Sequence, residues 1–196
     1  MAIYKDKEFD IDFNKSVLIV VDMIKGFTDV GMFKNDYVKN IAKDIRNVCN
    51  KFKTIVAIND NHEESDIEFN NYPKHCLSNS VESEICDELS DVKFTNVLFK
   101  NSTNGFFADN FLDVFNKYIK EKYDFVVVGC CTDICILQLC LTFKGYLNSI
   151  NSDSNIVVVR KLVDTYDSQQ HNREYLSEVS FYFMENMGVR LVDCII

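Results

Sequence analysis

Cys135 is the residue of this 196-residue chain whose type and position best suit nucleophilic chemistry. The apolar residues 126–128 before it predict a strand that is buried on both faces. Thr132 and Asp133 can each cap a helix N-terminus, and apolar residues after them recur at helical spacing. We therefore expect Cys135 in the first turn of a helix, beyond a core strand, where open α/β sheets place their active crevices. The helix dipole there favours an anion and can lower a thiol pKa.

Asp22, Asp60 and Lys100 stand at the ends of three other apolar runs that predict buried strands. Because the carboxyl ends of parallel strands meet at one edge of a sheet, we expect these side chains to converge with Cys135. A thiol, a carboxylate and an ammonium in one crevice suit nucleophilic catalysis. Asp22 would accept the thiol proton and later deliver it to a leaving group, while Lys100 would stabilise the thiolate and hold Asp22 ionised.

Each of these residues also has a simpler interpretation. Cys135 alone fits a small buried apolar residue, which is what most free cysteines are. Asp22 alone fits a strand-end cap, and Lys100 alone fits a solvated charge. Their arrival from separate strands at one edge of a sheet is what favours the catalytic interpretation.

A second group of chemically active residues lies in the polar segment 60–80. Asp60 and His62 are two residues apart, which puts both side chains on the same side of an extended chain. His75 returns from the far end of the segment, and Glu68 lies between them as a fourth candidate. Two imidazoles and carboxylates with open positions suit zinc, iron or manganese, so we expect a divalent metal, with zinc as the first choice. The alternative is an acidic solvated loop with incidental histidines.

The elements that must position these residues alternate along the chain. Short apolar runs predict six strands, over residues 16–22, 54–59, 96–99, 126–128, 155–159 and 189–196. Apolar residues at helical spacing predict helices over residues 37–52, 81–89, 107–119, 168–187 and the segment after Asp133, with a loop over 23–33. This alternation is typical of α/β proteins with a parallel sheet and helices on both faces. His171, the remaining histidine, stands apart from both groups and is assigned no role.

Composition narrows the class of protein. With 47% apolar and 26% charged residues and no linker-like segment, the chain is an ordinary globular sequence, and we expect one domain over residues 1–196. The net charge of -9 argues against nucleic acid or an anionic membrane surface as a partner. No apolar run approaches the ~20 residues of a membrane span.

The cysteines and the N-terminal segment bear on the compartment. The eight cysteines lie mostly in apolar segments, with no CxxC pair and no spacing of a disulfide framework. Residues 1–13 are charged and lack the apolar core of a secretion signal. We therefore expect a cytoplasmic protein in a reducing environment.

The segments that carry the candidate residues resemble the isochorismatase-like cysteine hydrolases, and most of all the nicotinamidases among them. The likeness runs from VLIVVDMIKGF near the start to GVRLVD near the end. VVDMIKGF resembles the segment with the family's catalytic aspartate, which falls on Asp22. FKNSTNGF resembles the segment with the catalytic lysine, here Lys100, and GCCTDICI resembles the nucleophile turn, here with Cys135.

The segment NDNHEESDIEFNNYPKHC resembles the nicotinamidase metal loop. Its ligands fall on Asp60, His62 and His75, and Glu68 stands where some members have another acidic ligand. The fold that this likeness implies is a three-layer α/β/α sandwich around a six-stranded parallel sheet. The likeness also leaves a homo-oligomer open, since members of the family often assemble.

The resemblance implies a reaction as well, the hydrolysis of nicotinamide to nicotinate and ammonia. Cys135 would attack the carboxamide carbon, Asp22 would protonate the leaving ammonia, and water would hydrolyse the resulting thioester. A cis peptide between Cys130 and Cys131 is implied, with the amide N–H groups of Cys131 and Cys135 forming an oxyanion hole. Phe27 matches an aromatic residue that lines the substrate ring, and the metal would bind the pyridine nitrogen.

The chain departs from the family pattern in two loops. Asn79 and Ser80 stand where nicotinamidases usually have Gly-Thr, and residues 103–106 read Thr-Asn-Gly-Phe where Ser-Ala-Phe is usual. These changes leave the hydrolase class standing but leave the substrate open. The alternative substrate is another small amide, such as a pyrazinamide-like or carbamoyl compound, and the alternative function is a catalytically silent member that binds a ligand. Isochorismatase activity itself is disfavoured because an ether hydrolase of this fold does not need the metal loop.

Overall fold

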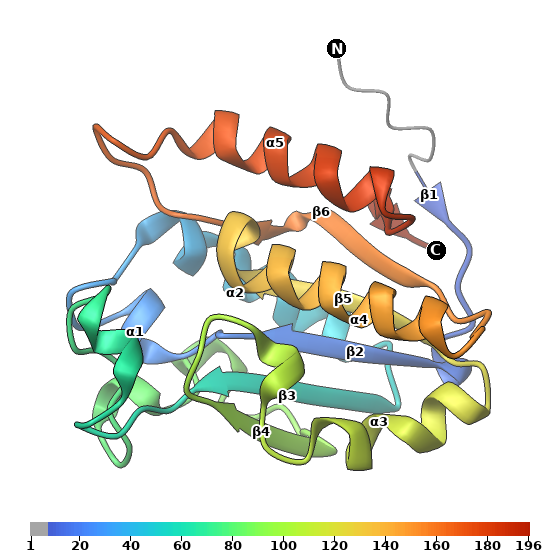
Figure 1. Cartoon of the computed structure of the whole chain (residues 1–196), viewed down its shortest axis with the longest axis horizontal. Coiled ribbons are helices and arrows are strands. Elements are labelled where there is room, and N and C mark those ends of the chain that lie inside the picture. Colours follow the sequence, from blue (N-terminus) through green and yellow to red (C-terminus); the bar gives the residue numbers. More distant parts are fainter. Residues whose placement is uncertain (1–7) are drawn as a thin grey trace.

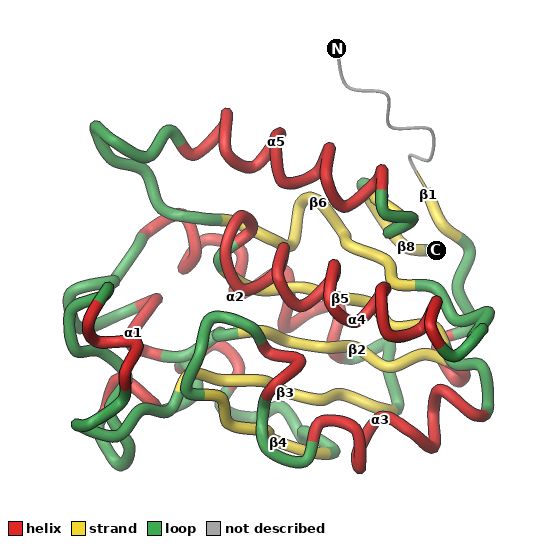
Figure 2. The backbone as a smooth tube through the Cα atoms, in the orientation of Figure 1, coloured by secondary structure: helices red, strands yellow, loops and turns green. Residues whose placement is uncertain are grey.

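A six-stranded parallel sheet forms the centre of the computed structural model, which describes residues 8–196 (Figures 1 and 2). Residues 1–7 of the expected domain span, and with them part of the charged N-terminal segment, lie outside that range. Every neighbouring pair of strands is parallel, as the sequence predicts. In order across the sheet the strands are β4 (Asn96–Lys100), β3 (Thr54–Asp60), β2 (Ser16–Val21), β5 (Asp124–Cys130), β6 (Ile156–Asp164) and β7 (Arg190–Val192).

Strand β2 shows why the apolar runs form central strands. All six of its residues are buried, because both faces of the sheet are covered. Successive side chains point to opposite faces, so Val17 and Ile19 belong to one hydrophobic cluster and Leu18 and Val20 to the other. The two clusters are the two interfaces of a layered fold.

Helices cover the sheet on both faces (Figure 1). The helix α2 (Asp36–Cys49) packs on one face, against the cluster that includes Leu18 and Val20. The helices α3 (Phe111–Lys120), α4 (Leu137–Ser149) and α5 (Arg173–Asn186) contribute to the cluster on the opposite face. This arrangement confirms the α/β/α sandwich around a six-stranded parallel sheet.

The structure corrects the expectation of a helix over residues 81–89. That segment forms two short 3-10 turns, Val81–Ser83 and Asp87–Leu89. Between them, Ile85 forms an antiparallel bridge with Ile24, and the neighbouring backbone groups bond to residues 23 and 25. These long-range hydrogen bonds replace the i to i−4 bonds that a helix would need. The partner segment, predicted as a loop, contains the short helix α1 (Lys25–Thr28).

Three other predicted elements differ in extent. The last strand divides into β7 and β8 (Cys194–Ile195), and β8 pairs in parallel with β1 (Glu8–Phe9) in a separate two-stranded sheet. Helix α5 begins at Arg173 rather than at residue 168, because the Asn172 side chain caps it by accepting a bond of 2.8 Å from the Tyr175 N–H. Helix α3 begins at Phe111, four residues after its predicted start, and follows the 3-10 turn Gly105–Phe107.

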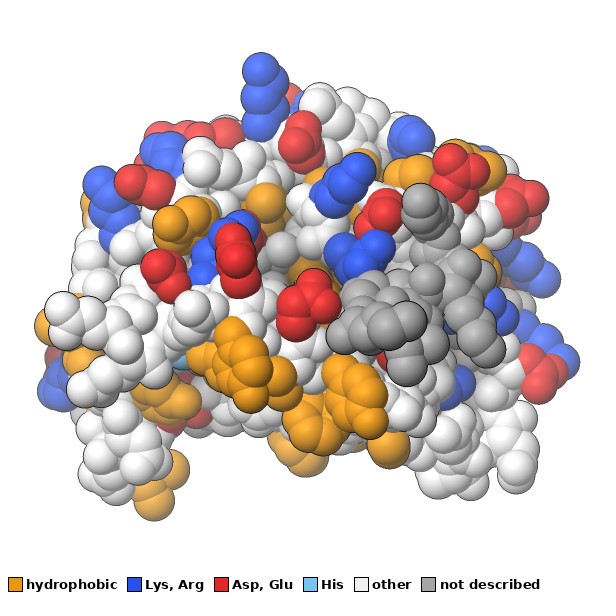
Figure 3. Space-filling view, turned by 90° about the horizontal axis from the view of Figure 1, so that it is seen from above, with side chains coloured by type: hydrophobic (Ala, Val, Ile, Leu, Met, Phe, Trp, Pro, Cys, Tyr) orange, Lys and Arg blue, Asp and Glu red, His pale blue; other side chains and the backbone are white. Residues whose placement is uncertain are grey.

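The surface of α5 retains apolar side chains. Four of them on this helix and its C-terminal end are at least half exposed: Tyr175, Tyr182, Phe183 and Met187. Figure 3, which looks down on the molecule from above, shows apolar groups among charged ones on that face. The assembly of several copies stays a prediction. Among the described residues, no helix combines the length and the apolar character that crossing a membrane requires.

Candidate active site

The carboxyl ends of four neighbouring strands bring the candidate residues together at one edge of the sheet. Asp22 directly follows β2, Asp60 and Lys100 are the last residues of β3 and β4, and Cys135 lies in the turn that follows β5. Asp60 and Lys100 are partners in the β3–β4 register. The strand-end convergence that the sequence predicts is therefore present.

Asp22 is held by the backbones of its neighbours. It adopts a left-handed conformation with φ of 53°, and its N–H donates to the Ile58 carbonyl over 2.9 Å. Its Oδ1 accepts a hydrogen bond of 2.8 Å from the Asp60 N–H. On the other side, Gly129 has φ of 114°, and a Cβ there would lie 2.0 Å from the Val21 carbonyl oxygen. Glycine thus lets β5 approach β2 at the point where the chain turns into Asp22.

Lys100 lies at the centre of the group. Its Nζ is 2.9 Å from Asp22 Oδ2, pairs with Asp60 Oδ1, and lies 3.6 Å from Cys135 Sγ. Lys100 Nζ thus contacts both the Asp22 carboxylate and the Cys135 sulfur. These residues are all buried, with Cys135 the most exposed at 5%. The structure therefore brings sulfur, carboxylate and ammonium into contact away from bulk water.

The charges of the group act strongly on one another. Burial opposes the charge of Lys100, but Asp22 and Asp60 outweigh it and raise the Lys100 pKa well above its usual value. Burial would raise the Asp60 pKa, yet Lys100 and the two imidazoles beside it lower that pKa far below the ordinary value. Burial and the charge of Asp60 raise the pKa of Asp22 to about 6. Asp60 therefore stays ionised, whereas Asp22 takes up a proton more readily than an exposed aspartate does.

Cys135 lies in a π-helical turn, Thr132–Ile136, rather than in the first turn of an α-helix. Cys131 occupies the N-cap position, and neither Thr132 nor Asp133 caps the turn with its side chain. Burial raises the pKa of the Cys135 thiol well above its usual value, although Lys100 opposes this. The expectation that a helix start lowers this pKa is therefore wrong, because desolvation dominates. The peptide bond between Cys130 and Cys131 is cis, as the resemblance implied.

A second group of three ligand-type residues adjoins the first. Atoms of Asp60, His62 and His75 that can bind a metal all lie within 4.8 Å of one another, and all three residues are buried. His62 Nε2 is 3.6 Å from Asp60 Oδ1, and His75 Nε2 is 3.5 Å from Asp60 Oδ2. Ligands on one tetrahedral zinc, with bonds of 2.0–2.1 Å, are ~3.3 Å apart, so these separations suit a shared ion.

The outer nitrogens of the two rings support this interpretation. His75 Nδ1 lies 2.8 Å from the Pro73 carbonyl, which can only accept, so Nδ1 carries the proton and Nε2 keeps its lone pair. His62 Nδ1 lies 3.1 Å from Asp66 Oδ2, and its buried Nε2 has no hydrogen-bond partner among the described residues. Carboxylates and carbonyls that orient histidines in this way are common behind metal ligands. The donor set therefore fits a divalent metal.

Glu68, the fourth predicted ligand, is not in that three-residue group among the described residues. Its Oε2 accepts a hydrogen bond of 2.9 Å from the Thr103 N–H, and its side chain lines the adjacent cavity. Thr103, one of the departures from the family pattern, thereby connects the segment after Lys100 with the metal segment. A ligand role for Glu68 stays a prediction.

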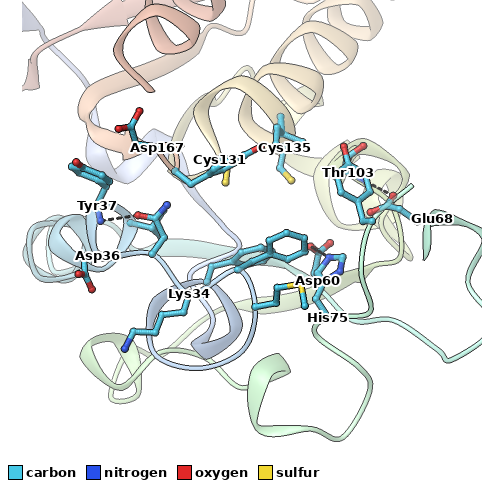
Figure 4. Close-up of a pocket in the computed structure, with 18 residues that line it drawn as sticks. Lys34, Asp36, Tyr37, Asp60, Glu68, His75, Thr103, Cys131, Cys135 and Asp167 are labelled. Carbon is cyan, nitrogen blue, oxygen red and sulfur yellow. Dashed lines mark hydrogen bonds and ion pairs between the residues drawn. The ribbon is translucent and has the colours of Figure 1, made fainter. Parts of the chain in front are cut away.

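The two groups open into a cavity of about 440 Å³, shown in Figure 4. This volume suits a small organic ligand. Phe27, which the resemblance assigned to the substrate ring, lines it together with Cys131, Cys135, Asp60 and His75. In Figure 4, Cys131 and Cys135 point into the cavity from above, with Asp60 and His75 facing them.

Sequence reasoning missed four aromatic residues of the cavity wall, of which Tyr37 lies in α2. The other three are Phe33, Tyr72 and Tyr166. All three come from loops, where no periodicity marks a residue as buried or functional. Only Tyr72 had a usable signal, since it falls inside the predicted metal segment.

The departure at Asn79 has a structural explanation. Its φ is 61°, in the left-handed region that favours glycine and that asparagine tolerates better than most residues. Asparagine can therefore replace the usual glycine without changing the path of the loop.

Comparison with known proteins places the chain among similar folds. A family model described as "Isochorismatase domain" matches residues 16–183. Nicotinamidase 1 of Arabidopsis thaliana is 27% identical over 207 residues, covering 90% of this chain and 84% of that protein. The crystal structure of PnC1 from L. infantum in complex with nicotinate has a TM-score of 0.78 at 18% identity, over 95% of this chain and 98% of that one. The structure of the pyrazinamidase of Pyrococcus horikoshii in complex with zinc has a TM-score of 0.71 at 20% identity, over 91% and 98%. At such identities the solved structures show a shared fold.

Proposed function

Because the chain belongs to the isochorismatase family of hydrolases, we propose that it is a metal-dependent nicotinamidase, which hydrolyses nicotinamide to nicotinate and ammonia. One observation carries this proposal. A buried thiol, carboxylate and ammonium are in contact beside an Asp-His-His group, and both open into one cavity with aromatic walls. Relatives named for nicotinamide and pyrazinamide hydrolysis support the same substrate class.

Nucleophilic attack requires that the Cys135 thiol lose its proton. Asp22 and the thiol are both neighbours of Lys100 Nζ, and the raised Asp22 pKa of about 6 makes this carboxylate a better proton acceptor than an ordinary aspartate. The proton moves from Sγ to the Asp22 carboxylate, and Lys100 at 3.6 Å stabilises the thiolate that forms. The sulfur then attacks the carboxamide carbon and gives a tetrahedral oxyanion. In this proposal the N–H groups of Cys131 and Cys135 bind that oxyanion.

Collapse of the tetrahedral species breaks the C–N bond. Asp22 returns its proton to the leaving nitrogen, so ammonia departs and a thioester on Cys135 remains. A water molecule then attacks the thioester carbon while Asp22 takes up one of its protons. The C–S bond breaks, nicotinic acid leaves and loses its proton to water to give nicotinate, and the thiolate takes back the proton from Asp22, which restores the resting site.

Asp60, His62 and His75 would hold the divalent metal, for which zinc is our first choice and iron or manganese are alternatives. The metal would supply a Lewis acid for the pyridine nitrogen and so orient the substrate ring. Phe27 would pack on that ring from the cavity wall. Glu68 would act as a further ligand or position the segment after Lys100 through Thr103.

Ammonia release from nicotinamide tests this proposal. The purified protein with zinc is expected to release ammonia and nicotinate in equal amounts, and Cys135→Ala is expected to release neither. Pyrazinamide and a carbamoyl compound serve as comparison substrates. Release from one of these but not from nicotinamide would overturn the substrate assignment, and a wild-type rate in Cys135→Ala would overturn the mechanism. Binding of nicotinamide without turnover would indicate the silent, ligand-binding alternative.

A further inference from the structure

The loop after β6 supplies one wall of the cavity. Tyr166 and Asp167 both line it, and Figure 4 shows Asp167 at the end of the cavity opposite Glu68 and Thr103. The loop is attached at its base by Arg173, which binds Asp164 through two hydrogen bonds of 2.6 and 2.9 Å. The sequence identified no function for this loop.

His171 joins the loop to the turn that carries the nucleophile. Its Nε2 lies 2.7 Å from Asp133 Oδ2, and Asp133 is two residues before Cys135 in the π-helical turn. Its Nδ1 lies 2.9 Å from the Tyr166 carbonyl oxygen, and its ring stacks on the Tyr166 ring at 3.7 Å with 19° between the planes. One imidazole thus contacts both the backbone and the ring of a residue in the cavity wall.

The partners of His171 fix where the protons of its two hydrogen bonds lie. The Tyr166 carbonyl only accepts, so Nδ1 donates to it. Nε2 faces a carboxylate oxygen at 2.7 Å, so a proton must lie between Nε2 and Asp133 Oδ2. Side-chain exposures of 12% for His171 and 10% for Asp133 shield this bond from water.

The Tyr166 ring is supported by His171 and remains partly exposed. His171 stacks on its ring, yet the residue keeps an exposed fraction of 36% and lines the cavity. Burial and then the charges of Asp133 and Cys131 raise the pKa of Tyr166 above its usual value. A planar ring that is supported by a neighbouring ring and borders the cavity is suited to stacking on a planar substrate.

The geometry points to a specific role for these residues: Asp133 and His171 position Tyr166 as an aromatic wall that packs on the planar ring of the amide substrate. Asp133 and His171 are positioning residues, and Tyr166 contacts the substrate. The inference rests on the proposed function only for the identity of that substrate. It supplies a second aromatic wall in addition to the one at Phe27.

Kinetics of a double-mutant cycle test this role. His171→Ala and Tyr166→Ala are each expected to raise KM for nicotinamide by about tenfold, the value of one aromatic contact, with kcat within about threefold of wild type. The double variant is expected to match Tyr166→Ala, because His171 acts through Tyr166. Multiplication of the two KM effects, or a loss confined to kcat, would overturn the role.

Two further variants separate positioning from general damage. Asp133→Asn can donate its amide N–H to Nε2 of a neutral His171, so it should keep KM within about twofold, whereas Asp133→Ala should behave like His171→Ala. Tyr175→Ala removes a tyrosine with an exposed fraction of 67% that is not among the described residues lining the cavity, and it should leave KM unchanged. Equal KM increases in Asp133→Asn and Asp133→Ala would contradict the hydrogen-bond account.

Hydrogen–deuterium exchange tests the same link without any substrate. Backbone amides of residues 165–171 are expected to exchange faster in His171→Ala, while Asp133→Asn and the amides of β5 stay as in wild type. Unchanged exchange over 165–171 would overturn the inference. If the wild type does not hydrolyse nicotinamide, the proposed function fails. The role of His171 is then still decided by the exchange rates of residues 165–171 and by KM for the amide that the protein does hydrolyse.

Discussion

The Asp60 N–H donates a hydrogen bond of 2.8 Å to Oδ1 of Asp22, so the proposed metal ligand also holds the proposed proton carrier. Lys100 pairs with both carboxylates. The two groups that the sequence suggested as separate features are therefore one buried network of charges. Such a network depends on every member, because removal of one partner leaves another charge buried and unpaired.

Replacement of Lys100 by methionine tests this network. Lys100→Met keeps the length of the side chain but leaves Asp22 and Asp60 buried without their shared cation. We expect it to lower the free energy of unfolding by about 3–5 kcal/mol and to abolish amide hydrolysis. Urea denaturation measures the first effect and ammonia release the second.

Lys122→Met is the matched control for that change. Lys122 pairs with Asp153 at 2.7 Å, but the two side chains are 67% and 76% exposed. An exposed pair of this kind is screened by water, so neither the unfolding curve nor the rate should change. A similar loss of stability in both variants would contradict the special position of Lys100.

The outer contacts of the metal group give a second prediction. His62→Ala removes a predicted ligand and is expected to abolish stoichiometric metal, as measured by elemental analysis. Asp66→Ala leaves the ligand in place but removes the carboxylate at His62 Nδ1, and it should weaken metal affinity by about 10–100-fold. His171→Ala, which is outside this group, should keep its metal. Full metal content in His62→Ala would refute the ligand assignment.

Two glycine substitutions give a third prediction. Gly129→Ala would place a Cβ 2.0 Å from the Val21 carbonyl oxygen in a backbone with φ of 114°, so we expect a loss of stability of at least about 3 kcal/mol. Gly145→Ala lies inside α4 with nothing within 4 Å of the new Cβ, and it should stabilise the protein by about 0.5–1 kcal/mol. Thermal unfolding of the two variants should give a lower melting temperature for Gly129→Ala than for Gly145→Ala. Equal melting temperatures would contradict the close approach of β5 and β2.

The strand ends of the site could be predicted from sequence because each follows a local signal. Asp22, Asp60 and Lys100 directly follow apolar runs, and parallel pairing then brings such residues to one edge. The spacing of Asp60 and His62 likewise indicated their common side.

The loops of the site could not be predicted, because long-range contacts determine their paths. Residues 81–89 have helical spacing, yet the bridge between Ile24 and Ile85 makes part of the segment extended. Tyr166 reaches the cavity because His171 connects its loop to Asp133, a contact across 38 positions in the chain. The raised pKa of Cys135 has the same origin, since burial by distant segments outweighs the local helix start.

Rapid-quench mass spectrometry of the intact protein tests most directly whether Cys135 forms a covalent bond with the amide carbon. Protein mixed with nicotinamide and quenched in acid should carry one nicotinoyl group, located on the peptide that contains Cys135. Cys135→Ser treated in the same way should carry no nicotinoyl group on that peptide. A nicotinoyl group on another residue, or ammonia release from Cys135→Ser at the wild-type rate in the same experiment, would contradict the account.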